Sequence, residues 1–176
     1  MTKVYLFILL CFSGLQACGQ TPTTTTPTPT TPAEQAKPAP YASAKEGWLV
    51  DLDEAYAISI RDKKPILANF TGSDWCGWCK RLDADVFSKP EFQTWAKENV
   101  VLLEVDFPRR FQLPPKNQQQ NAAMQNALQV TGYPTVWLLT MLKDDKGMYQ
   151  LTQMGKTGYT ASSEEFIATI NKMMHP

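Results

Sequence analysis

The sequence predicts an α/β fold: a mixed sheet of about four strands with helices on both faces. Three observations predict it. Short apolar runs alternate with helical patterns, which places helices over a sheet. A turn signal between two strand-like runs near the C-terminus adds an antiparallel hairpin. Two cysteines lie two residues apart where a strand meets a helix, as in redox sites.

The 176-residue chain has no net charge and no basic stripe, which disfavours nucleic-acid binding.

Residues 1–17 have the pattern of a secretory signal peptide. Lys3 supplies the positive charge, and Val4 to Phe12 form an apolar run too short to span a bilayer. The run Leu15-Gln16-Ala17-Cys18 resembles a bacterial lipobox, although Gln16 replaces the usual small residue. This resemblance implies that Cys18 is the lipid attachment site and the mature N-terminus. Ordinary cleavage after Ala17 is the alternative.

Residues 18–40 continue from Cys18 into a tether of Thr-Pro repeats followed by Ala, Glu, Gln, Lys and Pro. Such a composition favours extended backbone, at about 3 Å per residue, and cannot bury a core. We expect a spacer between a membrane anchor and a domain formed by residues 41–176. A glycosylated stalk is the alternative. The expected location is the bacterial cell envelope, with the domain in the periplasm or facing outward.

The first half of the domain reads as helix, strand and helix. Asp51-Leu52-Asp53-Glu54 has the form of a capping box, and a helical stripe continues to Lys64. Pro65 ends that helix and precedes a strand over residues 66–70. Residues 75–87 are expected to be mostly helical.

The middle of the domain reads as helix, strand, loop and helix. Ser88-Lys89-Pro90-Glu91 forms a second capping box, and Val100 to Asp106 reads as a buried strand. Pro108 to Lys116 is expected to be a loop, because Pro114-Pro115 interrupts regular structure. Asn117 to Val130 carries apolar residues at helical spacing.

The C-terminal part reads as a hairpin followed by a helix. Thr135 to Met141 and Met148 to Met154 are the strands, and Asp144-Asp145-Lys146-Gly147 is the turn between them. Ser162-Ser163-Glu164-Glu165 is expected to cap the last helix, whose apolar residues face inward.

The run Trp75-Cys76-Gly77-Trp78-Cys79-Lys80 is the strongest functional signal. A Cys-x-x-Cys pair at a strand-to-helix junction is typical of a thiol–disulfide redox site. A zinc site is disfavoured, because the domain has no second cysteine pair and the only histidine is His175. A structural disulfide and an inactive relic remain alternatives. No metal or other cofactor is expected.

A second motif, Gly132-Tyr133-Pro134-Thr135, stands before a strand well downstream. The two motifs in this order resemble the thioredoxin superfamily over roughly residues 48–174. The stretch ending in Asp85-Val86-Phe87 is similar to the branch that includes the DsbD C-terminal domain. The resemblance implies a thioredoxin fold, a cis Pro134 against the disulfide, Cys76 as nucleophile and a more buried Cys79 as resolving thiol.

The resemblance also implies which residues line the site. Trp75 would shield the dithiol, and Tyr133 would offer backbone groups to an extended substrate. Gly77 and Trp78 form the dipeptide between the cysteines, where Trp78 has core packing as its alternative. Asn69 stands near the place of a buried acid in thioredoxin, which puts a thioredoxin-like proton relay in question.

These observations together predict an envelope thiol–disulfide oxidoreductase. We expect it to reduce protein disulfides or to relay electrons, so its partners are protein disulfide or dithiol substrates and an envelope redox partner. It contacts the membrane through the lipid anchor. The alternatives are a disulfide oxidase or isomerase, and a thioredoxin-fold binding or chaperone-like module whose cysteines do not turn over.

Overall fold

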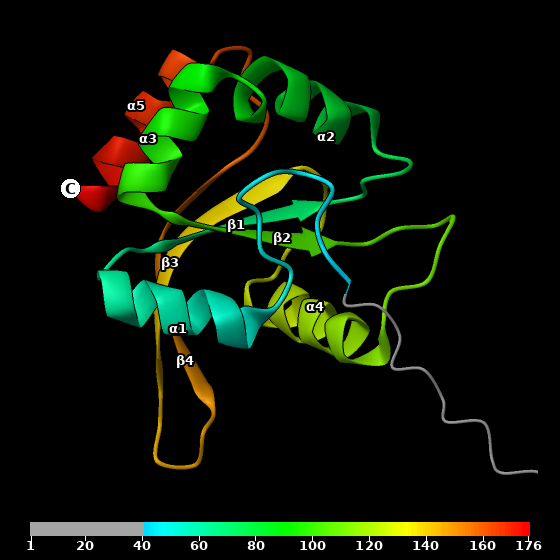
Figure 1. The fold of residues 1–176 in the computed structure, drawn as a ribbon, viewed down its shortest axis with the longest axis vertical. Coiled ribbons are helices and arrows are strands. Elements are labelled where there is room, and N and C mark those ends of the chain that lie inside the picture. The colour runs from blue at the N-terminus through cyan, green and yellow to red at the C-terminus, as the bar shows by residue number, and fades with distance from the viewer. Residues whose placement is uncertain (1–40) are drawn as a thin grey trace, which may run out of the picture. The chain divides into compact units, whose positions relative to one another are not determined.

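The computed structural model describes residues 41–176, and in that part four strands form one mixed sheet (Figure 1). The strands are β1 (Ile66–Thr71), β2 (Val101–Asp106), β3 (Thr135–Lys143) and β4 (Tyr149–Thr157). Their order is β2-β1-β3-β4; β1 is parallel to β2 and antiparallel to β3, and β4 is antiparallel to β3. The predicted mixed sheet of about four strands is confirmed.

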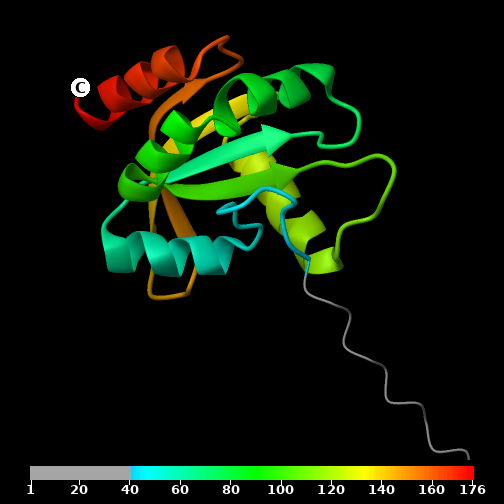
Figure 2. The ribbon, with the colours of Figure 1, turned by 45° about the horizontal axis from the view of Figure 1, so that its top comes forward.

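Helices cover both faces of this sheet, as predicted. They are α1 (Leu52–Asp62), α2 (Gly77–Leu82), the π-helical η1 (Asp83–Phe87), α3 (Pro90–Asn99), α4 (Pro115–Ala127) and α5 (Ser163–Met174). Helices α1 and α4 lie on one face, whereas α2, η1, α3 and α5 lie on the other (Figures 1 and 2). No helix within residues 41–176 has the length and apolarity needed to cross a membrane.

Strand β1 is buried along its whole length because both of its faces are covered. Ile66, Ala68 and Phe70 pack toward α1 and α4, and Leu67 packs toward α3 and α5. Phe70 is completely buried, so its truncation to alanine is expected to cost about 3–5 kcal/mol. The strand that carries the Cys-x-x-Cys loop is therefore a rigid base for it.

Two of the three predicted helix caps form. The Asp51 carboxylate accepts the backbone N–H groups of Asp53 and Glu54, and the Ser162 hydroxyl accepts that of Glu165. The capping box predicted at Ser88 is wrong, because α3 begins at Pro90 with Lys89 at the N-cap. Proline, which lacks an N–H, is favoured at the first helical position.

The same preference moves the start of α4. That helix begins at Pro115, two residues before the predicted start at Asn117, so the preceding loop is shorter than expected.

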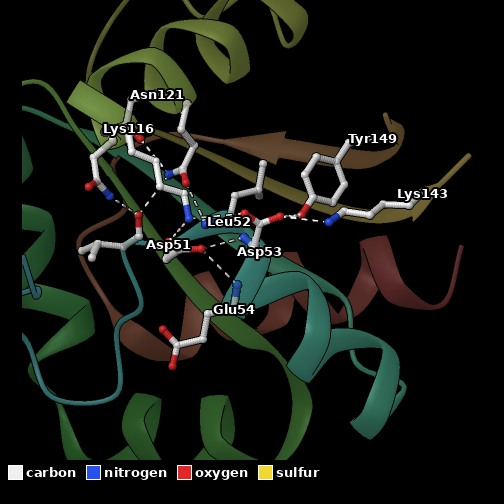
Figure 3. Close-up of polar contacts among 11 residues, drawn as sticks. Asp51, Leu52, Asp53, Glu54, Lys116, Asn121, Lys143 and Tyr149 are labelled. Carbon is white, nitrogen blue, oxygen red and sulfur yellow. Dashed lines mark hydrogen bonds and ion pairs between the residues drawn. The ribbon is translucent and has the colours of Figure 1, made fainter. Parts of the chain in front are cut away.

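A cluster of charged side chains ties α1 to α4 and to the β3–β4 hairpin (Figure 3). Lys116 of α4 contacts Asp51 at 2.5 Å, and Lys143 of β3 contacts Asp53 at 2.9 Å. The Tyr149 hydroxyl also donates to Asp53. Exposed pairs of this kind contribute about 0–1 kcal/mol each, so the cluster orients these elements more than it stabilises them.

The carboxyl ends of the parallel strands β1 and β2 meet at one edge of the sheet. The loop of residues 72–76 follows β1, and the loop of residues 107–114 follows β2; the two lie side by side there (Figures 1 and 2). The Cys-x-x-Cys motif is at this edge. The predicted signal peptide (1–17), the lipid attachment at Cys18 and the tether (18–40) lie outside the described residues.

Candidate active site

Cys76 and Cys79 form a disulfide at the first turn of α2. Their Cα atoms are 5.3 Å apart, and Cys76 is the N-cap residue of the helix. The backbone N–H of Cys79 points at the Cys76 sulfur, with 3.2 Å between nitrogen and sulfur. Donors and a helix dipole at this position stabilise a thiolate, which lowers the pKa of such a thiol.

Both cysteines are buried to the same degree, with 5% of Cys76 and 6% of Cys79 exposed. The expectation that Cys79 is the more buried is wrong for this disulfide form, because the bond joins two side chains that are almost equally shielded from solvent. Gly77, which follows Cys76, is exposed and has nothing within 4 Å of where a Cβ would stand. The surface beside Cys76 is therefore open.

Asp106 fixes the loop that leads into the motif. Its carboxylate accepts the Ser73 backbone N–H at 2.8 Å and the Ser73 hydroxyl at 2.6 Å. Its own carbonyl accepts the side-chain amide of Asn121 on α4 at 2.9 Å. Sequence reasoning missed this role, because Asp106 reads simply as the end of a strand.

Asp74 ties the two edge loops together. Its carboxylate accepts the backbone N–H groups of Arg109, at 3.0 and 3.1 Å, and of Arg110, at 2.5 Å. Desolvation raises the pKa of Asp74, but the Arg110 and Arg109 N–H groups outweigh it and hold that pKa below its ordinary value. The loop after β2 is thus fastened directly to the residue before Trp75.

Trp75 packs between the loop after β2 and the second motif. Its indole Nε1 donates to the Phe107 carbonyl at 2.8 Å, and its ring meets Tyr133 edge-on with centroids 5.8 Å apart. The Arg109 guanidinium stands 3.7 Å from the indole centroid. A Cβ on Gly72 would come within 2.4 Å of the indole, so this packing requires glycine there.

The second motif reaches the site through Tyr133. The Tyr133–Pro134 peptide bond is cis. The Tyr133 ring stacks on Phe107 at 5.3 Å, and its hydroxyl accepts the Gln125 side-chain amide at 2.7 Å. Burial raises the pKa of this phenol, and the Gln125 bond partly offsets the rise. The fold therefore brings the two motifs into contact. The hydrogen bond from Gln125 to Tyr133 could not be predicted from the sequence pattern.

Trp78 lies on the surface, with 55% of its side chain exposed. It packs against Tyr159, in the loop after β4, with ring centroids 5.0 Å apart, and the Arg81 guanidinium lies 5.1 Å from the indole centroid. The Tyr159 hydroxyl donates to Asp85 at 2.8 Å. Core packing is therefore the wrong alternative for Trp78.

Asn69 is buried on β1, on the sheet face that carries α2, and it is in register with Glu104 of β2. The side-chain amide oxygen of Asn69, Oδ1, has no hydrogen-bond partner among residues 41–176. Glu104 is buried as well; it accepts the Ser43 hydroxyl at 3.1 Å and pairs with Lys45. The buried acid beside Asn69 thus comes from β2 and not from β1.

Comparisons with known proteins agree with this fold. A family model described as thioredoxin-like matches residues 47–140. The disulfide bond reductase DsbH of Chlamydia pneumoniae is 35% identical over 66% of this chain and 66% of its own length. The thioredoxin-related protein DsbJ of the same organism is 28% identical over 61% of this chain and 30% of its own length. The chain thus spans just under two thirds of the first relative and less than a third of the second.

Two solved structures show the same architecture. A DsbH oxidoreductase superposes with a TM-score of 0.63 and 27% identity, covering 82% of this chain and 94% of that one. A thioredoxin from Thermus thermophilus superposes with a TM-score of 0.53 and 16% identity, covering 73% of this chain and 86% of that one. The second likeness concerns the fold alone.

Proposed function

The chain belongs to the thioredoxin-like family, and from this premise we propose that it is a thiol–disulfide oxidoreductase that reduces protein disulfides. The observation that carries the proposal is the Cys76–Cys79 disulfide at the first turn of α2. The 35% identity to a protein named disulfide bond reductase supports the direction. The uncharged Gly77-Trp78 dipeptide, which lacks histidine, supports it as well.

In the reduced protein Cys76 is the nucleophile. Its thiolate attacks one sulfur of the substrate disulfide, forms a mixed disulfide and releases the other substrate sulfur as a thiolate, which takes up a proton. Cys79 then loses its proton and attacks the Cys76 sulfur. That step releases the second substrate thiolate and leaves the Cys76–Cys79 disulfide. Two electrons pass to the substrate, and a dithiol donor protein restores the pair by the same exchange.

The residues around the pair would hold the substrate. Trp75 covers one side of the motif, whereas Gly77 leaves an open approach and Trp78 offers an exposed aromatic face. The backbone at Tyr133 and Pro134 would pair with an extended substrate segment. Strand-like pairing of this kind recognises backbone and leaves specificity to the side chains around it.

We place the protein in the bacterial envelope, with Cys18 as its lipid anchor and its partners among envelope proteins. The support is the signal-peptide and lipobox pattern of residues 1–18. A labelled fatty acid should appear on the protein and be absent from the Cys18→Ala variant. Labelling that persists in the variant would contradict lipid attachment at Cys18.

The activity is tested by insulin reduction with dithiothreitol as donor. The wild-type protein should accelerate insulin precipitation well above the rate with dithiothreitol alone, and Cys76→Ser should not. A wild-type rate no faster than that of Cys76→Ser would instead support a binding module whose cysteines do not turn over.

The direction is tested by the reduction potential of the pair in glutathione or dithiothreitol buffers. A reductase should have a potential near that of thioredoxin, about −270 mV, whereas about −120 to −180 mV is typical of oxidases and isomerases.

A further inference from the structure

Each cysteine of the motif is preceded by a tryptophan, and an arginine guanidinium lies near the ring of each tryptophan. The Arg109 guanidinium lies 3.7 Å from the centroid of Trp75. The Arg81 guanidinium lies 5.1 Å from the centroid of Trp78 and 5.8 Å from that of Tyr159. The arginines come from different segments, the loop after β2 and helix α2. Two arginine–aromatic contacts thus adjoin the disulfide.

These arginines are not neutralised by the domain itself. The ion pairs among residues 41–176 involve lysines and an arginine elsewhere: Lys45, Arg61, Lys116 and Lys143. Neither Arg81 nor Arg109 has a carboxylate partner there, and the same holds for the neighbouring Lys80 and Arg110. Lys80 instead donates to the backbone carbonyl of Asp74 at 3.1 Å.

Two carboxylates near these cations, Asp74 and Asp85, accept hydrogen bonds from uncharged donors. Asp74 accepts the backbone N–H groups of Arg109 and Arg110. Neither guanidinium forms an ion pair with Asp74 within 4 Å, although the Arg110 charge helps to lower the pKa of that carboxyl. Asp85 accepts the Tyr159 hydroxyl. The segments around the disulfide thus carry exposed cations that form no ion pair within residues 41–176, in a chain whose formal net charge is zero.

We propose that this rim, formed by Arg81 and Arg109 on their tryptophans, selects acidic segments beside the disulfide of the partner protein. The inference rests on the proposed function and names its substrate class. Stacking on an indole restricts a guanidinium and leaves its N–H groups free for carboxylate oxygens. Because the guanidinium is held in advance, less side-chain entropy is lost when a carboxylate binds.

The rim acts mainly on the rate of encounter. Arginines on an exposed surface steer oppositely charged partners, and this steering weakens as salt shortens the Debye length. The tryptophans by themselves would contact any extended segment, whatever its charge. Charge selection is therefore what the arginines add, and it is the property to measure.

The experiment uses the full chain, reduced in advance, and three peptides that share one disulfide loop but carry glutamate, glutamine or lysine flanks. The second-order rate of peptide reduction is followed by stopped-flow tryptophan fluorescence and checked by mass spectrometry. At low ionic strength we expect the glutamate peptide to react about tenfold faster than the lysine peptide. About 0.5 M salt should reduce this ratio to about twofold.

The double variant Arg81→Gln/Arg109→Gln should bring the glutamate-to-lysine ratio to about twofold while keeping the wild-type rate on the glutamine peptide. Arg81→Lys/Arg109→Lys keeps the charges but weakens the stacking, so it should retain part of the ratio. The matched control is Lys97→Gln/Lys172→Gln, which removes the same charge from the ends of α3 and α5 and should leave the ratio unchanged. The alkylation rate of Cys76 is measured against pH in the wild type and in the variants. An unchanged profile indicates that the arginines act on substrate selection, whereas a shifted profile indicates an altered Cys76 thiolate.

Equal wild-type rates on the three peptides would overturn the selection of acidic segments and leave the reductase intact. A ratio that survives in Arg81→Gln/Arg109→Gln would overturn the role of these arginines. A parallel fall in all three rates, with a shifted Cys76 alkylation profile, would assign the arginines to thiolate chemistry instead. A chain that reduces none of the peptides, and insulin no faster than Cys76→Ser, would remove the proposed function itself.

Discussion

The backbone N–H of Cys79 donates to the sulfur of Cys76, and this contact distinguishes two cysteines that are otherwise equally buried. A donor aimed at one sulfur favours negative charge on that sulfur. Cys76 is also the N-cap residue, where it meets the free N–H end of α2, whereas Cys79 lies within the first turn. The asymmetry supports Cys76 as the attacking thiol.

This asymmetry predicts which variant traps a substrate. Cys79→Ser should accumulate mixed disulfides with protein substrates, because Cys76 still attacks and nothing resolves the product. Cys76→Ser should accumulate few or none. Non-reducing gels and mass spectrometry after quenching with acid measure both. Equal trapping by the two variants would contradict the assignment.

Gly72→Ala should displace Trp75, because the added Cβ would come within 2.4 Å of the indole. The indole would lose its hydrogen bond to the Phe107 carbonyl, and we expect a loss of about 1–3 kcal/mol in the free energy of unfolding. Urea unfolding followed by tryptophan fluorescence measures it. The control is Gly77→Ala, where nothing lies within 4 Å; its stability should change by less than about 1 kcal/mol.

Asp106→Ala should loosen the loop that precedes the cysteines. It removes an acceptor for both the N–H and the hydroxyl of Ser73, and hydrogen bonds to a charged group contribute about 1.5–3 kcal/mol. We expect lower stability in urea and slower insulin reduction. Ser73→Ala removes only the hydroxyl bond and should show a smaller loss. If Ser73→Ala were the more harmful change, the carboxylate would not be what holds the loop.

The contribution of Asp53 to stability should depend on pH. Hydrogen bonds from Tyr149 and Lys143 hold the pKa of this carboxyl well below its ordinary value (Figure 3). A lowered pKa in the folded state stabilises the protein above the unfolded value of about 3.9, and that contribution is lost as the pH falls below it. Because Asp53 is exposed, the effect is modest, about 1 kcal/mol or less.

Asp53→Asn should therefore destabilise the protein more at pH 7 than at pH 3, as measured by urea unfolding at both values. Asp145→Asn, in the turn of the same hairpin, controls for the loss of one negative charge. An equal effect of Asp53→Asn at both pH values would exclude the proposed linkage.

Local patterns were sufficient to predict most of the fold. The strands at residues 66–70 and 100–106 can be predicted because both runs are apolar except for Asn69, Glu104 and Asp106, which is the pattern of strands covered on two faces. The caps at Asp51 and Ser162 were readable because a capping side chain bonds within its own helical turn. The Cys-x-x-Cys pair likewise depends on residues that are close in sequence.

The tertiary structure decided what surrounds the cysteines. Asp106 bonds to Ser73, and Asp74 to the loop of Arg109, across more than thirty residues of sequence. No pattern in the sequence predicts these contacts, because they form only when the parallel strands β1 and β2 bring their carboxyl ends together at one edge of the sheet. The sequence by itself determined the sheet, the helices and the redox pair. Only the folded chain placed unpaired arginines on the tryptophans beside that pair, because packing, and not local propensity, brings distant loops together.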